Sequence, residues 1–256
     1  MEAMRHTVWM LLTVVWLAAP GSAAAEEMPA AVTLGRARVQ APVADLRKEP
    51  IAPKSRMERD PLEESQLLAG DPVMVLEIQG EWARVSAVNQ QEWTHNRRWE
   101  GYPGWMRVLD LAPEPAEGKP TPANVPDPAT VREQIVKAAR GFLDASYYWG
   151  GRSPQAVDCS GLTGLSYQTA GVAIPRDAHE QWMKARPIVR ENLQPGDLVF
   201  LADPQNAHRI THVMLCVGGD EVIEAPGTGT TVREISLEER LKGAQDRRVY
   251  YGRYVD

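Results

Sequence analysis

A proline-rich segment divides this sequence into two parts. Six prolines fall between Pro113 and Pro128. Proline lacks a backbone N–H and has a fixed φ, so such a segment continues neither a helix nor a sheet and should be semi-extended. We therefore predict a linker over residues 113–127, an all-β domain over residues 26–112 and a second domain over residues 128–256. A chain of 256 residues is long enough for two small domains.

The first 25 residues have the pattern of a secretory signal peptide. Arg5 precedes an apolar run from Val8 to Ala19, and Ala23-Ala24-Ala25 offers a cleavage site. The apolar run is short for a membrane span. We therefore expect residues 1–25 to be removed on export, leaving a protein secreted to the periplasm or the exterior, without stable membrane association. An uncleaved anchor is the alternative.

The composition is that of an ordinary globular protein. The chain is 43% hydrophobic and 24% charged, with a net charge of −6. This negative charge argues against a nucleic-acid partner, whose binding surface would be basic. The two cysteines, Cys159 and Cys216, could form a disulfide in an oxidising compartment. Cys216, however, lies in an apolar run where a buried free thiol is the usual explanation.

Short strand-like segments separated by turn formers indicate an all-β fold before the linker. The segment from Asn89 to Glu100 has no periodicity and is predicted to be a long loop. Its aromatic residues form either a binding surface or a contact of the loop with its own domain. The predicted strands are Ala37–Val39, Val43–Leu46, Pro72–Ile78, Trp82–Val88 and Gly104–Val108.

Helices followed by strands indicate an α+β fold after the linker. Asp127-Pro128 is a favourable helix start, and Val131, Ile135, Ala138, Ala139 and Phe142 then mark one apolar helical face. A second helix is expected from Cys159 to the stop at Gly171. The predicted strands cover residues 197–201, 211–217, 221–225, 230–234 and 249–254.

The segment Asp158-Cys159-Ser160-Gly161 places a cysteine at or just inside the start of that second helix. Unpaired backbone N–H groups and the helix dipole favour a thiolate there, and can lower a cysteine pKa from about 8.5 to roughly 3.5–7.5. The alternative is a small buried residue at a helix contact. The flanking pattern favours a nucleophilic Cys159.

A nucleophilic cysteine needs a base, and the base needs a group that orients it. His179, His208 and His212 are the candidates in the second domain. His212 opens a strand and is therefore held rigidly. A zinc pair of His208 and His212 would need helical geometry, which the β-branched neighbours disfavour.

Glu224 follows His212 by twelve residues, on the next predicted strand. A carboxylate there could accept the imidazole Nδ1–H, fix the tautomer and stabilise the imidazolium. The alternative is that Glu224 is a solvent-facing strand residue.

These motifs resemble the NlpC-type cell-wall cysteine peptidases, an α+β family with a papain-like fold. The resemblance covers residues 128–256 and rests on an aromatic-Gly-Gly turn, the cysteine motif and three further segments. They are Tyr147 to Gly151, Asp158 to Gly161, Ile174-Pro175-Arg176, Pro195 to Leu198 and His212-Val213.

The resemblance implies that Cys159 is the nucleophile and His212 the base. The third catalytic position falls on Glu224, where many members of the family have His, Asn or Gln. Tyr147 is expected to reach towards the nucleophile and the oxyanion, which backbone N–H groups at Cys159 would stabilise.

The same resemblance implies a substrate pocket on the non-primed side of the cleft. Asp158, Ser160 and Asp177 are expected to line it, with Trp149 nearby. Many relatives have Ser after the aspartate, so Ala178 implies the loss of one contact.

The first domain resembles a bacterial SH3-like barrel over residues 37–112. The carriers are Gly80-Glu81-Trp82-Ala83-Arg84-Val85 and Gly101-Tyr102-Pro103-Gly104-Trp105-Met106. Such a barrel ahead of the peptidase domain resembles the γ-D-glutamyl–diamino-acid endopeptidases. In these the barrel closes the substrate groove.

This narrower resemblance implies that Glu64 and Tyr102, with Asp177, hold the ammonium of a free N-terminal L-Ala. The alternative for Glu64 is a charge on a helix surface. We therefore expect a monomeric cysteine endopeptidase that hydrolyses the γ-D-glutamyl–diamino-acid bond of peptidoglycan stem peptides, without metal or organic cofactor. A cell-wall amidase or acyltransferase of other specificity, and a non-catalytic wall-binding protein, are the alternatives.

Overall fold

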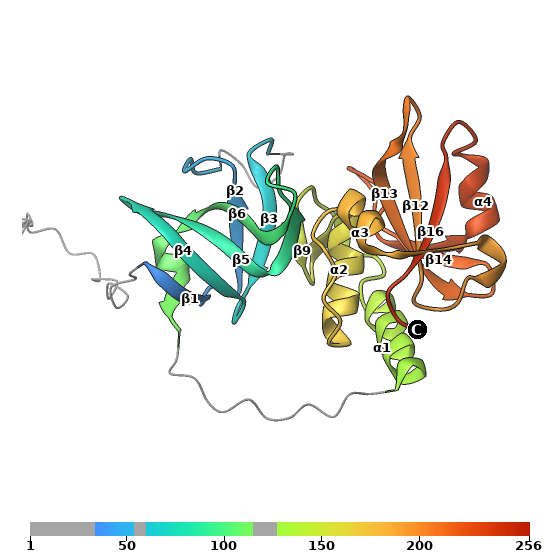
Figure 1. Cartoon of the computed structure of the whole chain (residues 1–256), viewed down its shortest axis with the longest axis horizontal. Coiled ribbons are helices and arrows are strands. Elements are labelled where there is room, and N and C mark those ends of the chain that lie inside the picture. The colour runs from blue at the N-terminus through green and yellow to red at the C-terminus, as the bar shows by residue number, and fades with distance from the viewer. Residues whose placement is uncertain (1–33, 54–59, 115–126) are drawn as a thin grey trace, which may run out of the picture.

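The computed structural model describes residues 34–53, 60–114 and 127–256. The predicted signal peptide and nearly all of the predicted linker lie outside these ranges. Two lobes lie side by side, a β-rich lobe and a mixed lobe, with short strands and two helices of the mixed lobe between the large sheets (Figure 1). Among the described residues, no helix is long and apolar enough to cross a membrane.

The first lobe is one seven-stranded antiparallel sheet, in the order β3-β2-β6-β5-β4-β1-β7. Its interior contains the fully buried side chains of Leu46, Val85, Met106 and Leu111. The sheet confirms the all-β prediction, and its assignment to the SH3-like family stays a prediction. The strands are β1 (Gly35–Val39), β2 (Val43–Arg47), β3 (Glu63–Leu68), β4 (Pro72–Gln79), β5 (Trp82–Trp93), β6 (Trp99–Arg107) and β7 (Leu111–Pro113), with a short 3-10 helix over Val108–Asp110.

The predicted loop over residues 89–100 is wrong. Strands β5 and β6 continue through it as a hairpin arm, and Trp93 pairs with Trp99 across the ladder. Their rings meet edge to face with centroids 5.3 Å apart, a favourable aromatic arrangement. The arm gave no strand signal because a bulge between Ala87 and Gln91 interrupts the alternation of its side chains.

Two helices of the second lobe confirm the sequence prediction. α1 (Pro128–Arg140) begins at Asp127, whose carboxylate accepts hydrogen bonds from two backbone N–H groups of the first turn. It buries Val131, Ile135 and Ala139. α2 (Cys159–Thr169) ends before Gly171, whose φ of 75° is one that glycine adopts readily.

The second lobe has a six-stranded antiparallel sheet with a buried layer on each face. Leu198 and Phe200 point towards the core that includes α1 and α2, whereas Val199 and Leu201 point to the opposite core. The sheet order is β11-β16-β12-β13-β14-β15. The strands are β11 (Arg186–Ile188), β12 (Leu198–Asp203), β13 (Asn206–Gly218), β14 (Glu221–Glu224), β15 (Arg233–Ser236) and β16 (Val249–Arg253).

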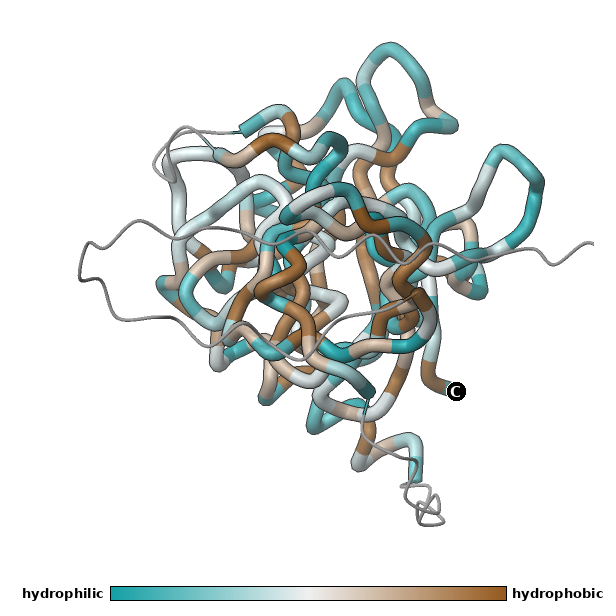
Figure 2. The backbone as a smooth tube through the Cα atoms, turned by 90° about the vertical axis from the view of Figure 1, so that its left-hand side faces the viewer, coloured by the Kyte–Doolittle hydropathy of each residue, from teal (hydrophilic) through white to brown (hydrophobic). Residues whose placement is uncertain are grey.

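Smaller elements complete this lobe. The short strands β8 (Ser146–Tyr147), β9 (Arg152–Ser153) and β10 (Ala156–Val157) form a three-stranded sheet, and β9 lies next to β3 of the first lobe. The remaining helices are α3 (Ala178–Lys184), α4 (Leu237–Lys242) and a 3-10 turn over Arg190–Asn192. Hydrophobic segments gather inside and hydrophilic loops project outward (Figure 2). These helices with an antiparallel sheet confirm an α+β lobe; its papain-like description stays a prediction.

Candidate active site

Cys159 is the first residue of α2, as the sequence predicted. Asp158 caps the helix, since its Oδ1 accepts a hydrogen bond from the Gly161 N–H at 2.6 Å. Its Oδ2 accepts another from the Gly150 N–H at 3.0 Å. Gly150 has a φ of 78°, which only glycine adopts without strain, so the predicted glycine turn is confirmed. Asp158 therefore ties the start of the helix to this turn.

Arg176 binds the same carboxylate from behind. Its Nη2 lies 2.7 Å from Asp158 Oδ2, and its Nη1 donates to Ser160 Oγ at 2.8 Å. Its Nε donates to Ser65 Oγ in β3, at 2.7 Å. Arg176 is 3% exposed, and its backbone N–H also binds the Gln91 carbonyl of the hairpin arm. One guanidinium thus joins the helix that carries the cysteine to the first lobe.

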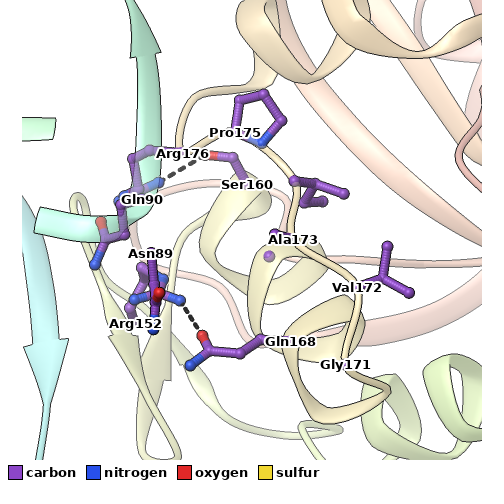
Figure 3. Close-up of a pocket in the computed structure, with 12 residues that line it drawn as sticks. Asn89, Gln90, Arg152, Ser160, Gln168, Gly171, Val172, Ala173, Pro175 and Arg176 are labelled. Carbon is purple, nitrogen blue, oxygen red and sulfur yellow. Dashed lines mark hydrogen bonds between the residues drawn. The ribbon is translucent and has the colours of Figure 1, made fainter. Parts of the chain in front are cut away.

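Arg176, Ser160 and Arg152 also line a hollow of about 200 Å³. Figure 3 shows Arg176 reaching Ser160 there, and Arg152 reaching Gln168. The Arg152 backbone N–H also donates to Gln66 Oε1 of the first lobe at 3.1 Å. These bonds pair Arg152 and Arg176 with groups of the protein itself.

His212 lies on β13 and Glu224 on the neighbouring strand β14. The imidazole Nε2 is 2.8 Å from Glu224 Oε2. The sequence had assigned this contact to Nδ1, which is wrong. A carboxylate at Nε2 holds the proton on that nitrogen, so Nδ1 is left as the acceptor.

Glu224 is fully buried, so the solvent-facing alternative is wrong. Arg233 donates hydrogen bonds from two nitrogens to Oε1, at 2.7 and 3.1 Å. Arg240 Nε donates to Oε2 at 2.7 Å. Burial opposes ionisation, but hydrogen bonds from His212 and both arginines outweigh it and lower the pKa of Glu224 to about 2. The carboxylate beside the imidazole is therefore permanently charged.

The cysteine thiol does not behave as the sequence predicted. Burial, together with the Asp158 carboxylate, raises the pKa of Cys159 to about 12, although the Val213 and Ser160 backbone N–H groups act in the opposite direction. Burial also lowers the pKa of His212. The pair at rest is thus an uncharged thiol and an uncharged imidazole, so nucleophilic attack requires a base to take the proton. Both cysteines are free thiols, and no disulfide joins Cys159 to Cys216.

The cysteine and the histidine share one cleft of about 440 Å³. Both lobes contribute to its walls. Nine of the ten predicted site residues line it, and the tenth, Glu224, lies behind His212. The lining residues are Lys48, Glu64, Tyr102, Tyr147, Trp149, Asp158, Cys159, Ser160, Asp177, Ala178, His179, Arg209, Ile210, Thr211, His212 and Pro226.

The first lobe adds an acidic group to this cleft. The Tyr102 hydroxyl lies 3.2 Å from Glu64 Oε2 and 3.0 Å from Asp177 Oδ2. One hydroxyl proton satisfies only one of these carboxylates at a time. Glu64 is on strand β3, so the alternative of a helix surface is wrong, and its Oε1 pairs with Lys48 Nζ at 2.8 Å. Burial raises the pKa of Asp177, and burial with the Asp177 charge raises that of Tyr102.

Sequence reasoning missed several residues of the site. Lys48 and Arg209 line the cleft, and Arg233 and Arg240 hold Glu224. These four residues carry no local pattern of their own. His179, one of the three candidate bases, also lines the cleft. Among residues 34–53, 60–114 and 127–256, no three His, Cys, Asp or Glu side chains gather as a potential metal site.

Comparison with known proteins places this geometry in a family. Residues 144–249 match the NlpC/P60 family. This part of the chain is an NlpC/P60 family domain. The match includes Cys159, His212 and Glu224.

Similar curated proteins are peptidases. The gamma-D-glutamyl-L-lysine dipeptidyl-peptidase of Bacillus subtilis (strain 168) is 25% identical over 231 residues, which cover 70% of this chain and 77% of that protein. A probable endopeptidase of Corynebacterium glutamicum (strain R) is 36% identical over 123 residues, 48% of this chain and 54% of that protein. Together with the family match, these relatives support a hydrolytic peptidase.

A solved structure shares the fold. The crystal structure of an NlpC/P60 family protein from Bacillus cereus ATCC 10987 superposes with a TM-score of 0.72 at 22% identity. The superposition covers 86% of this chain and the whole of that protein. The common fold therefore extends beyond the peptidase domain.

Proposed function

We propose that this protein is a cysteine endopeptidase that hydrolyses the γ-D-glutamyl–diamino-acid bond of peptidoglycan stem peptides with a free N-terminal L-Ala. The observation that carries the proposal is the position of the Glu64–Tyr102–Asp177 group in the same cleft as Cys159 and His212. The name of the B. subtilis relative, with its γ-D-glutamyl-L-lysine specificity, agrees with it.

The chemistry begins at the uncharged Cys159–His212 pair. As Sγ attacks the γ-carbonyl carbon, His212 Nδ1 takes the thiol proton, and Glu224 stabilises the imidazolium through Nε2–H. Backbone N–H groups at the start of α2, with Tyr147, stabilise the oxyanion. The tetrahedral intermediate then expels the amine of the diamino acid, which takes the proton from His212.

Water completes the reaction. His212 removes a proton from a water molecule as its oxygen attacks the thioester carbon, and the C–S bond breaks to release L-Ala-D-Glu. The sulfur leaves as a thiolate and regains the proton from the imidazolium. The charged Glu224 remains in place throughout, because both arginines hold it.

The charges of the acidic group match one ammonium. The cations beside Glu64 and Asp177 are Lys48, 2.8 Å from Glu64, and Arg176, 3.8 Å from Asp177 but only 2.7 Å from Asp158. With Arg176 and Asp158 taken as one pair, the two carboxylates and Lys48 leave one negative charge, which complements the N-terminal ammonium of the peptide. An acylated amine would leave a desolvated carboxylate unpaired, which disfavours binding strongly.

Two further parts of the proposal concern organisation and location. The seven-stranded sheet acts as an SH3-like domain that closes the cleft over the N-terminus of the substrate. The predicted signal peptide would deliver the enzyme to the periplasm or the exterior, where peptidoglycan is made and degraded.

Mass spectrometry of L-Ala-γ-D-Glu-meso-diaminopimelate incubated with the mature protein tests this function. We expect L-Ala-D-Glu and free diaminopimelate, and no product from the Cys159→Ala variant. Cys216→Ala, which removes the other free thiol, should keep the activity. Cleavage at another amide would favour an amidase of other specificity. Binding without any cleavage would favour a wall-binding protein.

A further inference from the structure

The cleft contains a cationic side chain to which the proposed reaction assigns no role. It is Arg209 of β13, which lines the cleft together with His179 of α3. The Ile210 backbone N–H donates to His179 Nδ1 at 3.2 Å, so β13 is bound to α3 at this point. This bond fixes the backbone position from which the Arg209 side chain extends.

Arg209 is only loosely engaged within the protein. Its Nη1 lies 3.4 Å from Asp203 Oδ2, and 67% of its side chain is exposed. A guanidinium has five N–H donors in a planar fork that matches a carboxylate. Most of these donors are therefore available to a molecule in the cleft.

Two other cations near the cleft are already paired with carboxylates. Lys48 pairs with Glu64 at 2.8 Å, and Arg176 is buried behind Asp158 at 2.7 Å. Arg209 pairs with no carboxylate that lines the cleft. Its charge is close enough to His179 to help burial lower the pKa of that histidine.

The proposed substrate brings an anion to this place. A glutamate linked through its γ-carbonyl keeps its α-carboxylate, and the following diamino acid carries a carboxylate of its own. Both lie within a few bonds of the scissile amide. Asp158 and Asp177 would repel such an anion, and the methyl group of Ala178 gives it no hydrogen bond. A cation elsewhere on the lining of the cleft, such as Arg209, would offset this repulsion.

We propose that Arg209 binds a substrate carboxylate beside the scissile bond, and so acts as a specificity determinant for zwitterionic peptides. This inference rests on the proposed function. The ammonium of the substrate lies at the Glu64–Tyr102–Asp177 group and the carboxylate lies at Arg209, both in the cleft that contains Cys159. The charge-assisted pair favours substrates that have both groups over those that lack the anion.

Three peptides distinguish the two sources of the carboxylate. The reference is L-Ala-γ-D-Glu-L-Lys; the second has D-isoglutamine, whose α-carboxylate is amidated; the third ends in lysinamide. We expect Arg209→Gln to lower kcat/KM for the reference about tenfold, as for the loss of one charge-assisted bond. This loss should vanish for the peptide that lacks the recognised carboxylate. If the loss vanishes for the D-isoglutamine peptide, Arg209 binds the α-carboxylate of the glutamate; if it vanishes for the lysinamide peptide, Arg209 binds the carboxylate of the diamino acid.

Two variants control for structure and charge. Arg84→Gln removes an exposed arginine of β5 outside the cleft and should leave kcat/KM unchanged for all three peptides. Arg209→Lys keeps the charge and should recover part of the loss. An equal loss on every peptide, or none on the reference, would overturn the role of Arg209. If the wild-type protein cleaves neither these peptides nor L-Ala-γ-D-Glu-meso-diaminopimelate, the proposed function itself fails.

Discussion

At the scale of single residues, the base is the most strongly determined part of this site. Glu224 receives hydrogen bonds from His212, Arg233 and Arg240, which together fill both of its oxygens. The two arginines and the imidazole fix the buried carboxylate, and the carboxylate fixes the ring. The orientation of His212 is therefore set by residues that never reach the cleft.

Glu224→Gln should alter the pH profile as well as the rate. Glu224 raises the pKa of His212 against the opposing effect of burial. The base is active when neutral, so removing this charge should move the acid limb of kcat to lower pH. We expect kcat to fall about 100-fold, because the imidazolium loses its stabilising carboxylate.

A neighbouring glutamate provides the matched control. Glu234 of β15 forms a surface pair with Arg140, away from His212. Glu234→Gln should leave both kcat and the acid limb as they are. An acid limb that stays in place, or moves to higher pH, in the Glu224→Gln variant would contradict the role given to Glu224.

The positions of Cys159 and His212 were predictable because their own segments contain the signal. Cys159 follows a capping aspartate at a helix start. His212 was expected to open a strand, but β13 begins at Asn206 and His212 begins only its buried part. Arg233 and Arg240 were not predictable. They lie on β15 and α4, and only the tertiary structure brings them to the buried Glu224. The predicted lowering of the Cys159 pKa was wrong for a similar reason. The sequence indicates the helix start, but not the burial of the thiol by the surrounding chain, which raises the pKa.

At the scale of elements, α2 is held in register by close contact with the glycine turn before it. A Cβ at Gly161 would clash with the Gly151 carbonyl oxygen and lie 3.0 Å from Asp158 Oδ1. Gly164, one turn later in the same helix, has no heavy atom within 4 Å of the corresponding position. The two glycines therefore have different reasons to be glycine.

Gly161→Ala should destabilise the protein by about 2 kcal/mol, because the overpacked helix start must move away from the turn. Gly164→Ala should stabilise it by up to about 1 kcal/mol through helix propensity. Urea unfolding followed by circular dichroism measures both. Equal effects of the two substitutions would show that the close approach of α2 to the turn contributes nothing to stability.

Elements with a cap and a regular apolar face were predictable, as α1 and α2 show. The hairpin arm of β5 and β6 was not, because a bulge interrupts its period and both of its faces are partly exposed. Short elements such as α3 have too few residues to show a period. Their positions depend on tertiary contacts, such as the hydrogen bond that the Arg176 N–H, just before α3, donates to the Gln91 carbonyl oxygen.

At the scale of the whole molecule, the cleft is a product of both lobes. Glu64 and Tyr102 come from the first sheet, whereas Asp177, Cys159 and His212 come from the second lobe. The interface network through Arg176 holds these walls together. We therefore propose, as our central claim, that the first lobe selects the N-terminus of the substrate.

The most direct test compares kcat/KM for L-Ala-γ-D-Glu-meso-diaminopimelate and its N-acetylated form, in the wild-type protein and in a Tyr102→Phe/Asp177→Asn variant. N-acetylation should lower kcat/KM of the wild-type protein about 100-fold, because a desolvated carboxylate is left unpaired. In the variant this ratio should fall to a few. Equal cleavage of both peptides by the wild-type protein, or an unchanged ratio in the variant, would contradict the claim.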